Sequence, residues 1–135
     1  MTNKAVEKSL RSQLRINGYK LLSDPKKNGE TGEDLIAEKD NRITVFEIIG
    51  YKTNGPARSL DFYQVFFRAI SRIDKFENAK IVIALCSNFQ RGMKQRTDQY
   101  GSSWIKIGNA FPEIEVWFVK DEEINASSWN DLKNI

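Results

Sequence analysis

The stretch GEDLIAEKDNRITVFEIIG, residues 32–50, carries the clearest structural pattern in the chain. It reads as two β-strands joined at Asp40-Asn41, a dipeptide suited to the positive φ angles of a two-residue hairpin turn. If those two residues form the whole loop, Asp34 at the start of the first strand lies opposite Glu47 in the second. Because side chains alternate along a strand, both carboxylates then face the same side of the sheet.

The two carboxylates of this hairpin need a positive partner. Directly opposed residues have Cβ atoms roughly 5 Å apart, a separation at which like charges repel. Glu47 also interrupts the apolar run 43–49, where a charge is costly to bury unless it is paired or bound to a metal. A divalent metal, with the backbone carbonyl of Ile48 as a further oxygen ligand, is one solution. An ion pair with a neighbouring lysine or arginine is the other, and the sequence leaves both open.

The composition is that of an ordinary globular chain, and it excludes several kinds of active site. At 135 residues we expect a single domain, 1–135, and the net charge of +3 is compatible with an anionic partner. The chain has no histidine, which excludes serine–histidine triads and disfavours a typical zinc site. The single cysteine, Cys86, is expected to be a buried apolar residue. With no hydrophobic signal region and no membrane-spanning run, we expect a cytoplasmic protein without membrane association.

Helical periodicity is present in three segments outside the hairpin. The first predicted helix covers residues 4–17 and the second covers residues 59–76. A third follows a stripe between Phe89 and Ile107, although Gly101 disfavours a helix in its middle. The apolar positions at helical spacing in the second helix are Leu60, Tyr63, Phe67, Ile70 and Ile73.

The remaining strands complete a prediction of the fold class. Short strands are expected at residues 19–22 and 115–119, and the tail 120–135 is expected to close with a turn or short helix. The run 81–86 is continuously apolar, which is typical of a central strand covered on both faces. Because both faces of the hairpin are also largely apolar, we expect an α/β three-layer sandwich with one small mixed sheet flanked by helices.

The order of elements over residues 4–86, together with the two acids, resembles the PD-(D/E)XK, or restriction-endonuclease-like, nuclease superfamily. In that pattern an acidic residue opens one hairpin strand, and an acid-x-lysine triplet lies in the next. The resemblance implies a DNA endonuclease in which Asp34 and Glu47 hold Mg²⁺ or Mn²⁺. It also implies supporting roles in the site for Glu7 on the first helix and Gln64 on the second.

A looser similarity is to the excision controlling factor (XisH-type) family of cyanobacteria, which belongs to the same superfamily. It rests on the pattern Leu-x-x-x-Gly-aromatic at residues 14–19 and on the loop that contains Asp24-Pro25. This similarity implies a role in DNA rearrangement or excision.

Ile49 occupies the position of the lysine in the triplet, and this is the main departure from the superfamily pattern. Its methyl groups can neither orient a water molecule nor stabilise developing negative charge. One alternative is a relocated base, either Lys52 brought round by a bulge at Gly50 or Arg68 from the second helix. The other is loss of catalysis, which leaves a regulatory or protein-interaction module of the same fold.

Basic side chains around the expected cleft are candidates for phosphate contacts with DNA. Arg91, Lys94 and Arg96 are expected instead to solvate the third helix. Superfamily members frequently pair, so the resemblance also implies a homodimer. Trp104, Trp117 and Trp129 are candidates for a dimer surface, although packing in the core explains Trp104 and Trp117 more simply. The candidates for DNA binding are Lys26, Lys27, Lys52, Arg58, Arg68 and Arg72.

Overall fold

The computed structural model describes residues 1–27 and 29–135, so Asn28 of the polar loop before the hairpin lies outside the described residues. The described residues form a mixed α/β fold with one six-stranded mixed sheet and four α-helices. The strands are arranged in the sheet in the order in which they occur along the chain. They are β1 Lys20–Leu21, β2 Leu35–Lys39, β3 Arg42–Ile49, β4 Lys80–Cys86, β5 Ile114–Val119 and β6 Ile124–Ser128.

The hairpin between β2 and β3 has the predicted turn and register. Asp40 and Asn41 have φ angles of 53° and 63°, the left-handed values that a tight two-residue turn requires. Lys39 pairs with Arg42, and the antiparallel register continues to Leu35 opposite Phe46. The turn therefore fixes which residues of the two strands face each other.

β4 is the central strand, as the sequence predicts. It runs parallel to both β3 and β5, and its residues from Ile81 to Cys86 are all buried. Cys86 is buried as expected. The tail closes with a short helix as predicted, the 3₁₀ helix η2, Asn130–Asn134. Before it, residues 124–128 form β6, an antiparallel edge strand on β5 that the sequence did not predict. Most of β6 is exposed, so it lacks the apolar alternation by which a strand is recognised.

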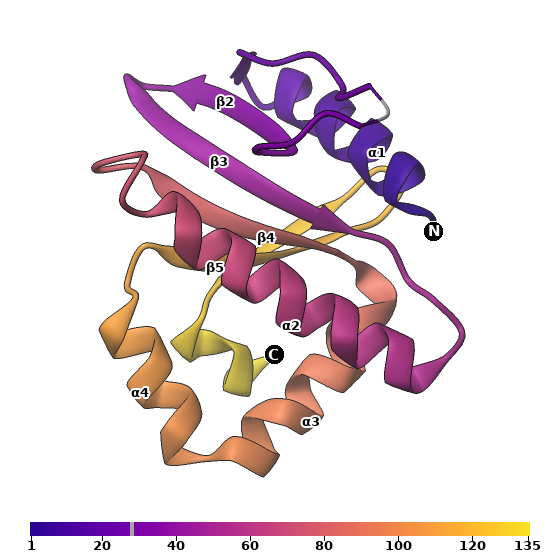
Figure 1. Cartoon of the computed structure of the whole chain (residues 1–135), viewed down its shortest axis with the longest axis vertical. Coiled ribbons are helices and arrows are strands. Elements are labelled where there is room, and N and C mark those ends of the chain that lie inside the picture. The colour runs from indigo at the N-terminus through magenta and orange to yellow at the C-terminus, as the bar shows by residue number, and fades with distance from the viewer. Residues whose placement is uncertain (28) are drawn as a thin grey trace.

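The α-helices lie on both sides of the sheet. α1, Asn3–Ile16, packs with the predicted residues Val6, Leu10 and Leu14 buried. Figure 1 shows α1 on the opposite side of the sheet from α2, Gly55–Arg72. α3, Gln90–Tyr100, and α4, Ser102–Ala110, lie with η2 on the α2 side. Among the helices of the described ranges, none is both long and apolar enough to cross a membrane.

The second helix differs from the prediction in both its limits and its buried face. It begins at Gly55 because Asn54 caps it, with the Asn54 side chain accepting a hydrogen bond from the Ala57 amide. The first part of the predicted stripe faces solvent, since Leu60 is 62% exposed and Phe67 is 69% exposed. Its last member, Ile73, is partly buried against the core as predicted. The residues that α2 buries are Phe62, Val65 and Ala69, which lie on a different face of the helix from Leu60 and Phe67.

The third predicted helix is two helices. Gly101 has a φ angle of 52°, which ends α3, and α4 begins at the next residue. Trp104 of α4 and Trp129 stack at 4.1 Å between ring centroids, and each indole N–H donates to the backbone carbonyl of the other residue. All three tryptophans are buried, which confirms core packing for Trp104 and Trp117 and overturns the alternative that the three form a dimer surface.

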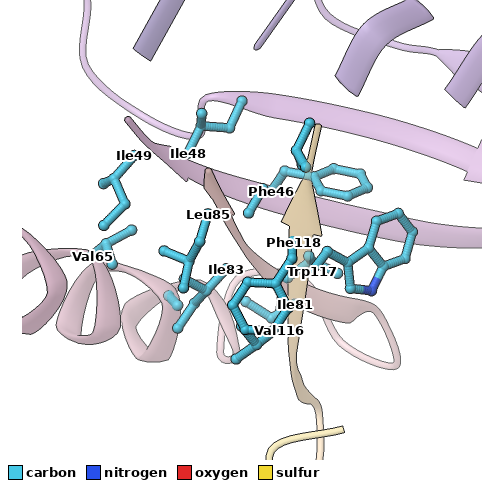
Figure 2. Close-up of a cluster of buried hydrophobic side chains, with 14 of the residues drawn as sticks. Phe46, Ile48, Ile49, Val65, Ile81, Ile83, Leu85, Val116, Trp117 and Phe118 are labelled. Carbon is cyan, nitrogen blue, oxygen red and sulfur yellow. The ribbon is translucent and has the colours of Figure 1, made fainter. Parts of the chain in front are cut away.

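The buried side chains fill both faces of the sheet. Figure 2 shows Ile49, Ile83 and Leu85 directed toward α2, with Ile49 pointing at Val65. On the opposite face Phe46 meets the ring of Trp117 edge to face, with ring centroids 5.1 Å apart. Glu47 lies in β3 on the α2 side of the sheet, because it alternates with Phe46 and Ile48.

Candidate functional site: an ion-paired acidic cluster

Asp34 and Glu47 converge, as the hairpin register predicts. The Asp34 amide N–H donates to Glu47 Oε2 at 3.2 Å, and the Ile48 amide N–H donates to Asp34 Oδ2 at 2.8 Å. Backbone groups thus hold the two carboxylates together at the point where β2 begins beside β3.

Each carboxylate has its own cationic partner. Lys26 Nζ lies 2.8 Å from Asp34 Oδ1. The Arg72 guanidinium, from the last turn of α2, donates to Glu47 Oε1 from Nε at 3.1 Å and from Nη2 at 2.9 Å. Of the two solutions that the sequence left open, this structure contains the ion pairs.

Glu33 extends the network on its other side. Its Oε1 lies 3.8 Å from Arg72 Nη1 and 2.8 Å from Lys75 Nζ. The cluster therefore combines three carboxylates with three cations, and its charges balance. We refer to Lys26, Glu33, Asp34, Glu47, Arg72 and Lys75 as the acidic cluster.

Glu47 is the most deeply buried member of the acidic cluster, with 1% of its surface exposed. Burial raises the pKa of Glu47, and the charge of Asp34 raises it further, while the Arg72 guanidinium acts in the opposite direction. A buried carboxylate of this kind depends on its partner, since removing one member of a buried pair leaves an uncompensated charge.

In this arrangement the cluster's own cations and backbone amides take up the oxygens that a Mg²⁺ or Mn²⁺ ion would need. Mg²⁺ requires near-octahedral coordination by oxygen atoms, with at least some supplied by carboxylates. Here all four carboxylate oxygens of Asp34 and Glu47 already accept a hydrogen bond or contact a cation. The Ile48 amide N–H donates to Asp34 Oδ2, and the role predicted for the Ile48 carbonyl stays a prediction. Within residues 1–27 and 29–135 there is no group of three His, Cys, Asp or Glu side chains that could hold a metal.

Glu7 and Gln64 do not join the two acids. Glu7 forms an ion pair at 2.8 Å with Arg11 of its own helix, on the side of the sheet opposite α2. Arg11 in turn donates to the Ser23 carbonyl, so this pair fixes α1 to the loop before the hairpin. Gln64 is exposed on α2, where it lines a shallow hollow with Tyr63 and Phe67.

The two candidates for a relocated base also lie elsewhere. Lys52 Nζ is 3.0 Å from Asp61 Oδ2. Gly50, where a bulge was proposed, packs closely against the N-terminal residues instead. Its amide N–H donates to Asn3 Oδ1, and a Cβ added at Gly50 would collide with the backbone of residues 1–3. Arg68 is exposed, and it is Arg72, one turn further along α2, that reaches Glu47.

The other basic candidates have mixed environments. Arg58 donates to the carbonyls of Lys52 and Thr53, both at 2.8 Å, and so braces the loop before α2. Lys26 belongs to the acidic cluster, whereas Lys27 is exposed beside it in the sequence.

Ile49 lies where the superfamily triplet has its lysine, and it belongs to the core. It is 3% exposed and points toward Val65. This position therefore supplies packing on α2 and no ammonium group to the acids.

Arg72 is the residue whose role sequence reasoning missed, because it was considered only as a DNA contact. The signal that could have identified it is the helical stripe Phe62, Val65 and Ala69, which continues to position 72. An arginine at the end of a buried stripe lies within reach of a charge on the sheet beneath it.

Comparisons with known proteins identify similar folds. No protein-family model matches the chain, and no curated protein matches it in sequence. The chain is similar to the solved structure of an fdxN element excision controlling factor protein from Anabaena variabilis, with 17% identity, a TM-score of 0.63, and coverage of 93% of this chain and 98% of that one. It is also similar to an XisH family protein from Nostoc punctiforme, with 14% identity, a TM-score of 0.58, and coverage of 90% and 96%. At these identities the likeness establishes a shared fold.

Proposed function

We propose that this protein is a PD-(D/E)XK-fold relative that acts at DNA in rearrangement or excision and does not cut DNA itself. The proposal includes a restriction-endonuclease-like core and a three-layer arrangement around the sheet. It is supported by the convergence of Asp34 and Glu47 and by similarity to two structures described as excision controlling factor and XisH family proteins.

The observation that carries the proposal is the ion pair between Glu47 and Arg72. A metal-dependent nuclease needs free carboxylate oxygens for the metal and a basic group to orient the attacking water. In this chain Arg72 occupies Glu47 Oε1, and the lysine position is the buried Ile49. Both the Arg72 contact and the buried Ile49 are explained if Asp34 and Glu47 are the remnant of a metal site and now serve as structural partners of Lys26 and Arg72.

A plasmid assay tests the absence of cleavage. Supercoiled plasmid is incubated with the protein over a titration of Mg²⁺ and of Mn²⁺, with Glu47→Gln in parallel. We expect neither protein to nick or linearise the plasmid. Metal-dependent cleavage by the wild type that is lost in Glu47→Gln would contradict the proposal and favour an active nuclease.

Binding to duplex DNA is measured separately, by titrating a labelled duplex at low salt. Four of the sequence-predicted contacts are exposed, and two of them, Lys26 and Lys52, form ion pairs with Asp34 and Asp61. Lys27 and Arg68 form no ion pair within the described residues, so replacing both with glutamine removes two accessible charges. We expect weaker binding. The slope of the logarithm of the binding constant against the logarithm of salt concentration should become shallower by roughly 0.9 for each phosphate contact that is lost. Wild-type protein that does not bind duplex DNA would contradict a role at DNA.

A second candidate function, that of a protein-interaction module, is favoured by the exposed apolar stripe of α2. The occupant we propose is a second copy of this chain. Antiparallel packing of two α2 helices about Gln64 places Leu60 of each copy near Phe67 of the other, which gives a self-complementary interface. The same arrangement brings the exposed Arg68 of each copy toward the Asp61 end of the other helix.

A further inference from the structure

A second polar site lies between α2 and α3, away from the acidic cluster. It is a groove with a volume of about 560 Å³, within the range of small-ligand sites. One wall comes from the first half of α2 and the other from α3, and its floor includes Tyr51 and Asn88. We refer to this hollow as the α2–α3 groove.

The groove lies beyond the carboxyl ends of two parallel strands. Tyr51 follows the end of β3, and Asn88 follows the end of β4. In α/β sheets, crevices outside the carboxyl ends of the strands are common sites of ligand binding. Arg58 in the groove and Arg72 in the acidic cluster are 14 residues apart on α2, a separation of about 21 Å along the helix axis. The groove is therefore distinct from the acidic cluster.

The lining of the α2–α3 groove is basic. Arg58, Arg91 and Arg96 line it, and no aspartate or glutamate does. Among the described residues, none of these three arginines lies within 4.0 Å of a carboxylate oxygen, unlike Lys26, Lys52 and Arg72. Within the described residues, therefore, no ion pair neutralises the arginines of the groove. This differs from the expectation that Arg91 and Arg96 only solvate a helix.

Two of the arginines are held by uncharged partners. The Arg58 guanidinium lies 4.6 Å from the centroid of the Tyr51 ring, and the Arg96 guanidinium lies 5.1 Å from that of Phe62. Arg96 also donates to Ser59 Oγ at 3.3 Å. Arg58 also donates from Nη1 to the carbonyls of Lys52 and Thr53. Contacts with rings, a hydroxyl and carbonyls orient a guanidinium without cancelling its charge, which preorganises it for an anion.

The end of the groove is aromatic. Tyr63 of α2 and Tyr100 of α3 meet there, with hydroxyl oxygens 3.5 Å apart, and both rings are partly exposed. Gln95 and Gln99 add amide groups to the same wall. Guanidinium groups bind phosphate, while aromatic rings stack on bases and amides hydrogen-bond their edges.

We propose that the α2–α3 groove binds a phosphate-bearing nucleotide unit, with the arginines on the phosphate and Tyr63 or Tyr100 on the base. The unit is either a free nucleotide or part of a single-stranded nucleic acid, which present the same chemistry to the groove. The site uses no member of the acidic cluster, so it does not depend on whether that cluster supports cleavage.

Fluorescence anisotropy with a labelled single-stranded DNA of mixed sequence, about 12 nucleotides long, tests this site. Arg91→Gln is the main variant, because the Arg91 side chain lines the groove and has no hydrogen bond or ion pair within the described residues. We expect about tenfold weaker binding, as for loss of one charged hydrogen bond. We also expect the slope of the logarithm of the binding constant against the logarithm of salt concentration to become shallower by roughly 0.7, the value for one phosphate contact on a single strand.

Two further variants separate charge from stacking. Lys106→Gln removes the same charge from an exposed site on α4 outside the groove, and we expect unchanged binding. Tyr100→Leu keeps apolar bulk and removes a ring, so we expect about fivefold weaker oligonucleotide binding. Circular dichroism confirms that each variant is folded.

Competition distinguishes the two sources of the nucleotide. Displacement of the oligonucleotide by millimolar deoxynucleoside monophosphate indicates that a free nucleotide is sufficient, and lack of displacement indicates that a strand is required. The proposal is overturned if the wild type binds neither ligand at low salt. It is also overturned if Arg91→Gln binds as tightly as Lys106→Gln. Loss of duplex binding in the Lys27 and Arg68 variant, with single-strand binding retained, would separate this site from the proposed function.

Discussion

The Arg72 guanidinium donates two hydrogen bonds to one oxygen of Glu47, joining the last turn of α2 to β3 of the sheet through a carboxylate that is 1% exposed. This contact links two segments that are 25 residues apart in the sequence. It makes the acidic cluster part of the packing between α2 and the sheet.

Arg72→Leu is expected to destabilise the protein by about 3 kcal/mol, because it leaves the buried Glu47 without its cation. The measurement is the free energy of unfolding from urea denaturation at neutral pH. Lys52→Met is the matched control, since it breaks the more exposed pair with Asp61 and should cost less than about 1 kcal/mol. Equal effects of the two substitutions would show that the Glu47 pair is not buried as described.

The stability of the wild type relative to Glu47→Gln is expected to fall as the pH rises above about 4.5. Burial raises the pKa of Glu47 above its ordinary value of 4.5, with a further rise from Asp34, so the folded protein binds this proton more tightly than the unfolded chain does. The stabilising contribution of the group is therefore present at low pH and is lost as the pH passes through the folded-state pKa.

The measurement is the denaturation midpoint of the wild type and of Glu47→Gln across a pH series. The other carboxyl groups are present in both proteins, so their titration largely cancels in the difference between the two midpoints. A difference that instead grows with pH would mean that Arg72 outweighs burial and lowers the pKa of Glu47.

Ile49→Lys is expected to yield a less stable protein that still does not cleave plasmid DNA. The new ammonium replaces packing against α2 and must be paired or brought to the surface, at a cost on the order of 2 kcal/mol. Lys26 and Arg72 still occupy the carboxylates, so the oxygens that a metal would need remain engaged. Ile49→Met is the control for packing alone. Gain of Mg²⁺-dependent cleavage in Ile49→Lys would show that the site lacks only its base.

Phe67→Ser is expected to weaken self-association without changing stability by more than about 0.5 kcal/mol, because the side chain is 69% exposed. Light scattering during size-exclusion chromatography over a range of protein concentrations measures the mass. Ile16→Ser, at a residue of α1 that is 73% exposed, removes a similar apolar surface from the other side of the sheet. A wild type that stays monomeric at all concentrations, or a loss of association in both variants, would contradict pairing through α2.

The part of the candidate site that depends only on the hairpin, the convergence of Asp34 and Glu47, was predictable from the sequence. Asp40-Asn41 adopts the turn that its residue types favour, and that turn places Asp34 beside Glu47 without information from the rest of the chain. The predicted burial of a charge within the run 43–49 is also correct. What the local pattern could not provide was the source of the compensating charge.

The sequence by itself determined the hairpin, its register and the central strand, because turn chemistry and the two-residue period act over a few residues. Only the tertiary structure decided which face of α2 is buried, since Phe62 and Phe67 are equally apolar and helical periodicity permits either stripe. That choice brings Arg72 to Glu47 and leaves Leu60 in solvent. Packing between distant segments, rather than any local preference, therefore turned a pair of acids into an ion-paired cluster.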